Sequence, residues 1–161
     1  AIVGKREIME NAQNTFISST FWSDRIGPVA ALETLKIMEQ TKSWRLITEI
    51  GKKIKKKWKE IANKNSIEID IKGISALPNF TFIDRDNSVY KTFITQEMLK
   101  KGILANQSLY VSVAHTEKNL DRYFNELDRI FSIIRKFEND GKKIEDLLDG
   151  PIANSLFQRL N

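Results

Sequence analysis

The sequence contains no cysteine, and only one of its 161 residues is a histidine. Without cysteine the chain has no disulfides, thiolate nucleophiles, zinc fingers or iron–sulfur clusters, which is typical of a reducing compartment such as the cytoplasm. The single histidine, His115, excludes metal sites and proton relays built on histidine pairs. The P-loop, the GxGxxG fingerprint and the HExxH motif are absent as well. We therefore predict no metal site and assign no catalytic residue.

Long apolar runs are also missing. None reaches the roughly 20 residues that a membrane-spanning helix needs, and no signal peptide opens the chain, so we expect no membrane partner. Seven glycines, three prolines and no sustained heptads exclude collagen-like and coiled-coil proteins. Because 41% of the residues are apolar, the chain can build the core of one medium domain, or of a small domain with an appended segment. It opens without methionine, in the apolar Ala1-Ile2-Val3, so we expect a piece of a longer protein.

The excess positive charge lies in one stretch. The net charge is +5, yet the stretch from Lys42 to Lys64 alone holds nine basic and two acidic residues. Apolar residues recur there at spacings of three and four, as on one face of an amphipathic helix: Trp44, Ile47, Ile50, Ile54, Trp58 and Ile61. The lysines fall on the other faces, which favours a solvated helix surface. The alternative is a non-catalytic module that binds nucleic acid or an acidic partner through the Lys52–Lys59 helix, although its tryptophans lie on the apolar face and not among the lysines.

Periodicity predicts an α+β fold in which helices pack on a small, mostly antiparallel sheet. Strands are expected near residues 67–71, 80–82 and 109–113. Helices are expected near residues 28–40, 41–63, 95–101 and 117–139, and in a short final segment with Leu156, Phe157 and Leu160. Residues 84–87 are predicted to form a polar turn, Gly102 a left-handed C-cap and Thr116 an N-cap. The helical residues 1–40 do not belong to this α+β layer.

The polar segment before the first long helix is the most informative local feature. Ser18-Ser19-Thr20 supply hydroxyl groups close to a helix N-terminus, where backbone N–H groups attract anions. Phe21 and Trp22 add a flat apolar surface. On chemistry alone, an anion site and an ordinary capped loop are equally good interpretations. His115 stands where a strand enters a helix, which favours a ring that hydrogen-bonds the backbone over a catalytic base.

Five segments, in order along the chain, resemble the C-terminal part of class III aminotransferases. They read AIVGKREIM, SSTFWSDRIGPVAALETLKIME, PNFTFID, TQEMLKKGILA and LYVSVAHTEKNLDRYFNELDRIF. Such enzymes are of fold type I and depend on pyridoxal 5′-phosphate, and the sequence is similar above all to glutamate-1-semialdehyde 2,1-aminomutase-like proteins. The resemblance implies three parts: 1–40 as the end of the large cofactor-binding domain, 41–139 as the C-terminal small domain, and 140–161 as a tail with a short helix.

The resemblance also implies where the chain meets the cofactor. A threonine of the family that reaches the cofactor phosphate of the neighbouring subunit in a homodimer matches Thr20, with Ser19 beside it. The lysine that forms the Schiff base lies in a glycine-rich motif upstream of Ala1, so Lys5, which fits a flanking motif, is not that residue. Family members often read GTLSGNP at this place, whereas this chain has the longer STFWSDRIGP, which leaves the backbone path after Thr20 open.

The implied parent protein is a cytoplasmic transaminase or aminomutase that acts on a small-molecule amino acid or amino-aldehyde. We expect this chain to supply at most a phosphate contact and the small domain. Because the catalytic lysine is missing, we expect the chain alone to be inactive. No catalytic role is assigned to His115.

Overall fold

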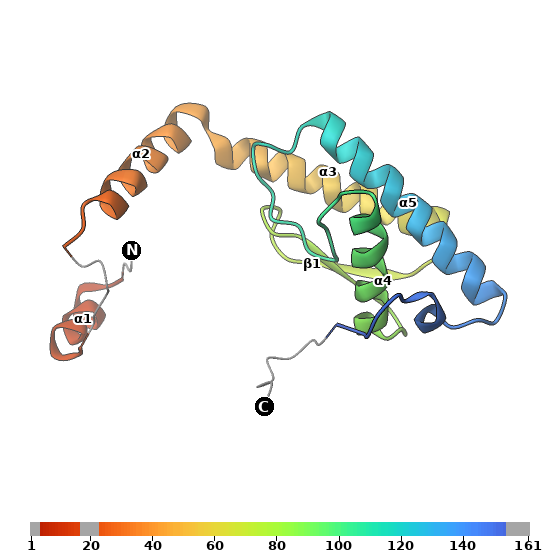
Figure 1. Ribbon diagram of the computed structural model, residues 1–161. Helices are drawn as coiled ribbons and strands as arrows, with labels where there is room; N and C mark the ends of the chain where they lie inside the picture. The colour runs from red at the N-terminus through yellow and green to blue at the C-terminus, as the bar shows by residue number, and fades with distance from the viewer. Residues whose placement is uncertain (1–3, 17–22, 154–161) are drawn as a thin grey trace. The chain divides into compact units, whose positions relative to one another are not determined.

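The chain divides into two compact units, Ala1–Thr41 and Lys42–Asn161. The computed structural model describes residues 4–16 and 23–153 (Figure 1). Within these residues unit 1 is helical, whereas unit 2 combines helices with a two-stranded sheet. The short helix expected around Leu156 to Leu160 lies outside the described residues.

Unit 1 consists of a short helical segment and one long helix. Helix α1 (Arg6–Met9) continues into a 3₁₀ turn over Glu10–Asn14. Helix α2 (Ile26–Thr41) confirms the helix predicted near residues 28–40, and it begins two residues earlier because the Asp24 carboxylate accepts a hydrogen bond of 2.9 Å from the Ile26 N–H. None of its described residues is buried, and its large apolar side chains are exposed: Ile26, Val29, Leu32, Leu35, Ile37 and Met38.

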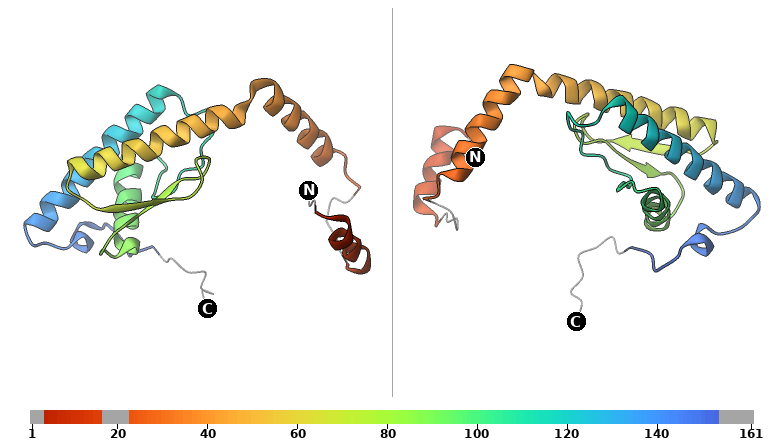
Figure 2. Two further views of the ribbon diagram at one scale, coloured as in Figure 1. Left: turned by 180° about the vertical axis from the view of Figure 1, so that it is seen from behind. Right: turned by 45° about the horizontal axis from the view of Figure 1, so that its top comes forward.

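Unit 2 packs long helices against a small antiparallel sheet, which confirms the predicted α+β fold. The two longest helices run side by side over the strands (Figure 2). The sheet register pairs Ile69 with Phe82 and Ile71 with Phe80. The elements of unit 2 are α3 (Ser43–Lys64), β1 (Ile69–Lys72), β2 (Asn79–Phe82), α4 (Asn87–Lys100), α5 (Glu117–Asn139) and a 3₁₀ turn over Ile144–Leu147.

The core of unit 2 is built around aromatic rings. Phe80 and Phe82 are two residues apart in β2, so both point to the face of the sheet that the helices cover. Trp58 of α3 meets Phe80 edge-on, with ring centroids 4.9 Å apart. Phe131 of α5 contacts both phenylalanines, at centroid distances of 6.0 and 5.5 Å. One ring cluster therefore joins the two long helices to the sheet.

The apolar stripe predicted on the lysine-rich helix is confirmed for most of its length. Ile54, Trp58 and Ile61 are buried, and Ile47 packs partly against the same core. The prediction is wrong for Trp44, whose surface is 46% exposed. Trp44 lies in the first turn of α3, where its neighbour Ser43 is buried and Trp44 is not, so helical spacing alone could not assign its burial.

Gly51 is the point of closest approach between α3 and the loop that follows β1. A Cβ atom at this position would lie 1.8 Å from the carbonyl oxygen of Ser75. The same loop is held a turn further along α3, where Lys55 Nζ donates a hydrogen bond of 2.5 Å to the Gly73 carbonyl. The absence of a side chain at Gly51 therefore sets how closely the loop packs on the helix.

Two predictions of secondary structure are wrong in detail. Helix α4 begins at Asn87, not near residue 95, because Asp86 is an N-cap whose carboxylate accepts a hydrogen bond of 2.9 Å from the Ser88 N–H. Residues 84–87 thus lead directly into the helix. The strand expected near residues 109–113 is reduced to a single bridge between Asn79 and Ser108, because this segment is held to the preceding loop by only a few backbone hydrogen bonds.

A charged pair ties the end of α5 to the turn after β2. Arg85 binds Glu138 through two hydrogen bonds, of 2.7 and 3.0 Å, and Tyr90 donates a third of 2.6 Å to the same carboxylate. Both charged side chains are only 18% exposed. The guanidinium lowers the pKa of Glu138 below its ordinary value, against the opposing effect of burial.

This pair predicts a loss of stability in acid. The pKa of Glu138 is lower in the folded than in the unfolded chain. The stabilisation that the ionised Glu138 gives the fold is therefore complete above the unfolded pKa, which is about 4.3 for an ordinary glutamate, and it is lost as the pH falls through the folded pKa. Glu138→Gln should lower the free energy of unfolding at pH 7 by about 1 to 2 kcal/mol and reduce its fall in acid. Denaturant unfolding at pH 7 and in acid measures the unfolding free energy of each variant. Glu10→Gln, at an exposed carboxylate, is the control. If the unfolding free energy of Glu138→Gln falls in acid as much as that of the wild type, Glu138 is not the group responsible.

Candidate functional site

The predicted cofactor contacts, Ser19 and Thr20, lie outside the described residues. The structure does describe the start of the helix that follows them. There the Asp24 carboxylate already accepts a hydrogen bond from the first N–H of α2. A phosphate bound at this helix end would lie close to that negative charge. The contact from Ser19 and Thr20 themselves stays a prediction.

Several lysines of the lysine-rich face of α3 are paired with carboxylates. Lys52 pairs with Glu49 at 2.9 Å, Lys57 pairs with Glu60 at 3.2 Å, and Lys53 pairs with Glu117 of α5. Such pairs on exposed side chains are typical of a solvated helix surface. The structure therefore gives no support to the alternative of a nucleic-acid or acidic-partner interface at Lys52–Lys59.

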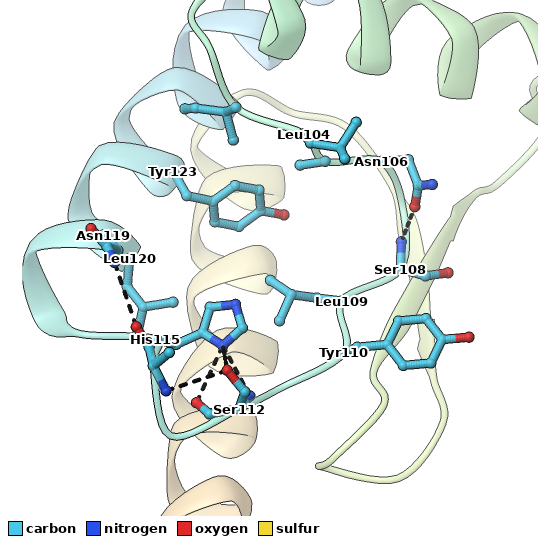
Figure 3. Close-up of a pocket in the computed structure, with 13 residues that line it drawn as sticks. Leu104, Asn106, Ser108, Leu109, Tyr110, Ser112, His115, Asn119, Leu120 and Tyr123 are labelled. Atoms are coloured by element: carbon cyan, nitrogen blue, oxygen red, sulfur yellow. Dashed lines mark hydrogen bonds between the residues drawn. The ribbon is translucent and has the colours of Figure 1, made fainter.

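Unit 2 contains a pocket of about 570 Å³ (Figure 3). One wall is the loop from Ile103 to Tyr110, a second is the turn from Ser112 to His115, and the third is the start of α5. All three come from one continuous stretch of sequence. The pocket is lined by Ile103, Leu104, Ala105, Asn106, Ser108, Leu109, Tyr110, Ser112, Ala114, His115, Asn119, Leu120 and Tyr123.

Backbone hydrogen bonds fix the loop wall of this pocket. The loop leaves α4 at Gly102, whose φ of +68° confirms the predicted left-handed C-cap. The Leu109 N–H then donates to the Pro78 carbonyl, and the Val111 N–H donates to the Ala76 carbonyl, each over 3.0 Å. The wall is therefore anchored to the loop before β2 although it forms no regular strand.

A buried amide holds the same loop against the sheet. Asn87 imitates a strand partner, since its Oδ1 accepts from the Phe82 N–H at 2.8 Å and its Nδ2 donates to the Phe82 carbonyl at 3.1 Å. The side chain of the buried Gln107 donates to the same Oδ1 at 3.2 Å, and the Gln107 backbone carbonyl accepts from the Phe80 N–H at 3.0 Å. Asn87 at the start of α4 and Gln107 in the loop thus position the pocket wall, and the sequence did not single out either side chain.

His115 closes the turn at the second wall. Its Nδ1 accepts a hydrogen bond of 2.9 Å from the Ser112 backbone N–H, which confirms the predicted contact with backbone at this corner. Thr116 then caps α5, also as predicted, by accepting from the Asn119 N–H at 3.3 Å. The ring is half-buried, and it lines the pocket.

Tyr123 forms the floor and is only 6% exposed. Its hydroxyl accepts a hydrogen bond of 2.9 Å from the indole N–H of Trp58. Burial raises the pKa of Tyr123, so the phenol stays neutral at physiological pH. The floor is therefore aromatic and uncharged.

The pocket does not fit pyridoxal phosphate by itself. None of its lining residues is a lysine that could bind the cofactor as an imine, and none is an arginine or lysine that could pair with the phosphate. Among residues 4–16 and 23–153 there is also no cluster of three or more acidic or histidine side chains suited to a metal ion. No step of cofactor chemistry can be assigned to the described residues.

The chain is similar in sequence to several known proteins. No family model matches it. It is 25% identical over 126 residues to 3-aminobutyryl-CoA aminotransferase of Cloacimonas acidaminovorans, a match that covers 74% of this chain and 30% of the relative. It is 26% identical over 148 residues to glutamate-1-semialdehyde 2,1-aminomutase of Sulfurihydrogenibium azorense, covering 81% of this chain and 35% of the relative. Its homologues are class III aminotransferases and aminomutases. This confirms the resemblance seen in the sequence.

A solved structure supports the same relationship at the level of the fold. The FumI protein of Sphingopyxis sp. MTA144, solved as the internal aldimine form of pyridoxal phosphate, matches with a TM-score of 0.74 and 20% identity over 90% of this chain and 35% of FumI. The chain thus spans about a third of the length of the proteins it matches. In the part of the chain that the structure describes, no helix is both long and apolar enough to cross a membrane.

Proposed function

We propose that this chain is the C-terminal segment of a pyridoxal-phosphate-dependent class III aminotransferase or aminomutase, and that the parent protein transfers an amino group on a small-molecule amino acid or amino-aldehyde. The observation that carries this proposal is that aminotransferases and an aminomutase match 74 to 85% of the chain, with a fold match over 90%. By their names, two of these relatives act on 3-aminobutyryl-CoA and on an aminopentol. We place the parent in the cytoplasm as a homodimer.

The bound cofactor supplies an electron sink for the amino-group carbon, and a lysine of the protein anchors it covalently. In our proposal residues 1–40 are the end of the large cofactor-binding domain, residues 41–139 are the small domain, and residues 140–161 are a tail. Ser19 and Thr20 donate hydroxyl hydrogen bonds to the cofactor phosphate of the neighbouring subunit. Because the anchoring lysine lies outside this chain, the chain alone has no transaminase activity.

Borohydride trapping of the complete parent protein tests the proposed function. After addition of pyridoxal phosphate, reduction should fix the cofactor on a lysine upstream of Ala1, which peptide mass spectrometry would locate. The purified 161-residue chain, treated in parallel, should show no turnover of an amino donor. A folded parent that traps no cofactor would reduce the family relationship to shared fold, and turnover by the chain alone would overturn its assignment as a non-catalytic segment.

Thr20→Val in the parent tests the phosphate contact. Loss of a hydrogen bond to a charged phosphate should weaken cofactor binding about tenfold or more, measured by fluorescence titration of the cofactor-free enzyme. Thr34→Val is a matched control, because the Thr34 hydroxyl only donates to the Ala30 carbonyl on the exposed surface of α2. If Thr20→Val and Thr34→Val bind the cofactor equally well, the phosphate contact is not made by Thr20.

A further inference from the structure

We propose that the pocket of unit 2 is a binding site for an uncharged small molecule with an apolar body and one carbonyl-type hydrogen-bond acceptor, held by the Nε2–H of His115. The site goes beyond the proposed function, because the pocket is complete within residues 103–123 and holds no group that the cofactor needs. Four features of the pocket lead to this ligand chemistry.

The first feature is the lack of charge. None of the residues that line the pocket is Asp, Glu, Lys or Arg, in a chain in which 29% of the residues are charged. A carboxylate or ammonium that entered would lose hydration without gaining a partner of opposite charge. An uncharged ligand avoids this cost.

The second feature is the direction of the donor on His115. The Ser112 N–H can only donate, so Nδ1, which it meets at 2.9 Å, must carry the lone pair. The longer contacts of Nδ1 with the Ser112 hydroxyl and carbonyl, both 3.2 Å, are secondary to this bond. The proton of the neutral ring is therefore on Nε2. Figure 3 shows this second nitrogen on the side of the ring away from Ser112, toward Leu109 and Tyr123.

The third feature is that Nε2 is available. Among the hydrogen bonds of residues 4–16 and 23–153, none uses this atom. A donor that is half-buried in an apolar cavity gains more from a ligand acceptor than one on the open surface, because water competes less. The ring nitrogen therefore provides one directional contact.

The fourth feature is the shape and stiffness of the apolar walls. Leu104 and Tyr110 of the loop provide the exposed apolar surface, and the almost fully buried Leu120 and Tyr123 of α5 back it. The loop is tied to residues 76–80 by backbone hydrogen bonds and through the buried Gln107. A cavity that is already formed spares the ligand the entropic cost of ordering its walls.

The experiment uses the 161-residue chain and three probes of matched length: hexanamide, hexanoate and hexylammonium. His115 is the single histidine, so its two ring carbon-bound protons give unique NMR signals that report on the pocket. Hexanamide should shift these signals in a saturable way with a dissociation constant of about 1 to 10 mM, as expected for a ligand of this size. Hexanoate and hexylammonium should bind at least about fivefold more weakly.

A variant tests the donor itself. His115→Phe keeps a flat ring and removes the N–H, so hexanamide should bind about fivefold more weakly, measured by saturation transfer to the probe. Lys118→Ala, in the first turn of α5 and outside the pocket lining, is the control and should bind like the wild type. Circular dichroism checks that both variants fold, and the titration of the wild type stands independently of them. The proposal is overturned if hexanamide leaves the histidine signals unchanged well above 10 mM, if hexanoate binds as tightly, or if a folded His115→Phe binds hexanamide normally.

Discussion

Gly51→Ala is expected to destabilise unit 2 by about 3 kcal/mol or more. The new Cβ would lie 1.8 Å from the Ser75 carbonyl oxygen and 2.5 Å from its carbonyl carbon, so it meets main chain and not the end of a flexible side chain. Either α3 or the loop after β1 must move. The loop is held near this point by the bond from Lys55 to the Gly73 carbonyl, which resists that movement.

Gly27→Ala provides the matched control. Gly27 is also helical, in α2, but no atom outside its immediate chain neighbourhood lies within 4 Å of an added Cβ. Alanine there should be neutral or stabilise the chain by up to about 1 kcal/mol. Urea unfolding followed by tryptophan fluorescence measures both variants. If Gly51→Ala unfolds at the wild-type midpoint, the close approach of the loop does not exist in solution.

Trp58→Ala is expected to cost about 3 to 5 kcal/mol of unfolding free energy. The side chain is 1% exposed, meets Phe80 edge-on at 4.9 Å, and donates its indole N–H to Tyr123. Truncation leaves a cavity and removes the partner of a buried hydroxyl, so two costs combine. Because Tyr123 is the floor of the pocket, the histidine signals of this variant should shift as well.

Trp44→Ala is the control for this second prediction. Both tryptophans fall on the same apolar stripe of α3, but Trp44 is 46% exposed, so its removal should cost less than about 1 kcal/mol. The comparison separates burial from position on the stripe. Equal losses for the two variants, measured by urea unfolding, would show that the first turn of α3 is covered in solution.

The elements that periodicity and capping determine could be predicted from the sequence. Helix α5 follows from its apolar spacing, and both of its ends could be located because Thr116 is a hydroxyl cap and the Asp140-Gly141 pair after Asn139 is typical of a helix end. Helix α4 was missed over its first two turns, because Asp86 and Asn87 are as typical of polar turns as of helix starts. The N-cap bond of Asp86 and the sheet contact of Asn87 with Phe82 decide between them.

The candidate site was harder to predict, because it contains no motif. The residues that line it are uncharged, and most of them lie on a loop. The position of this loop depends on its contacts with Asn87, through Gln107, and with the loop before β2, both distant in sequence. The one signal in the sequence was a lone histidine at a corner before a helix. That signal predicted correctly that the ring hydrogen-bonds backbone. The pocket beside the ring could not be predicted, because residues from a loop, a turn and a helix form it together.

The pairing of Trp58 with Tyr123 has a consequence for biosynthesis. The two residues are 65 positions apart, so at about 5 to 20 residues per second the ribosome needs roughly 3 to 13 s to deliver the partner of α3. During that interval the apolar stripe of α3 has no α5 to cover it. The lysines on the other faces of the helix, several of them paired with acidic neighbours on α3 itself, keep the nascent segment hydrated until α5 arrives.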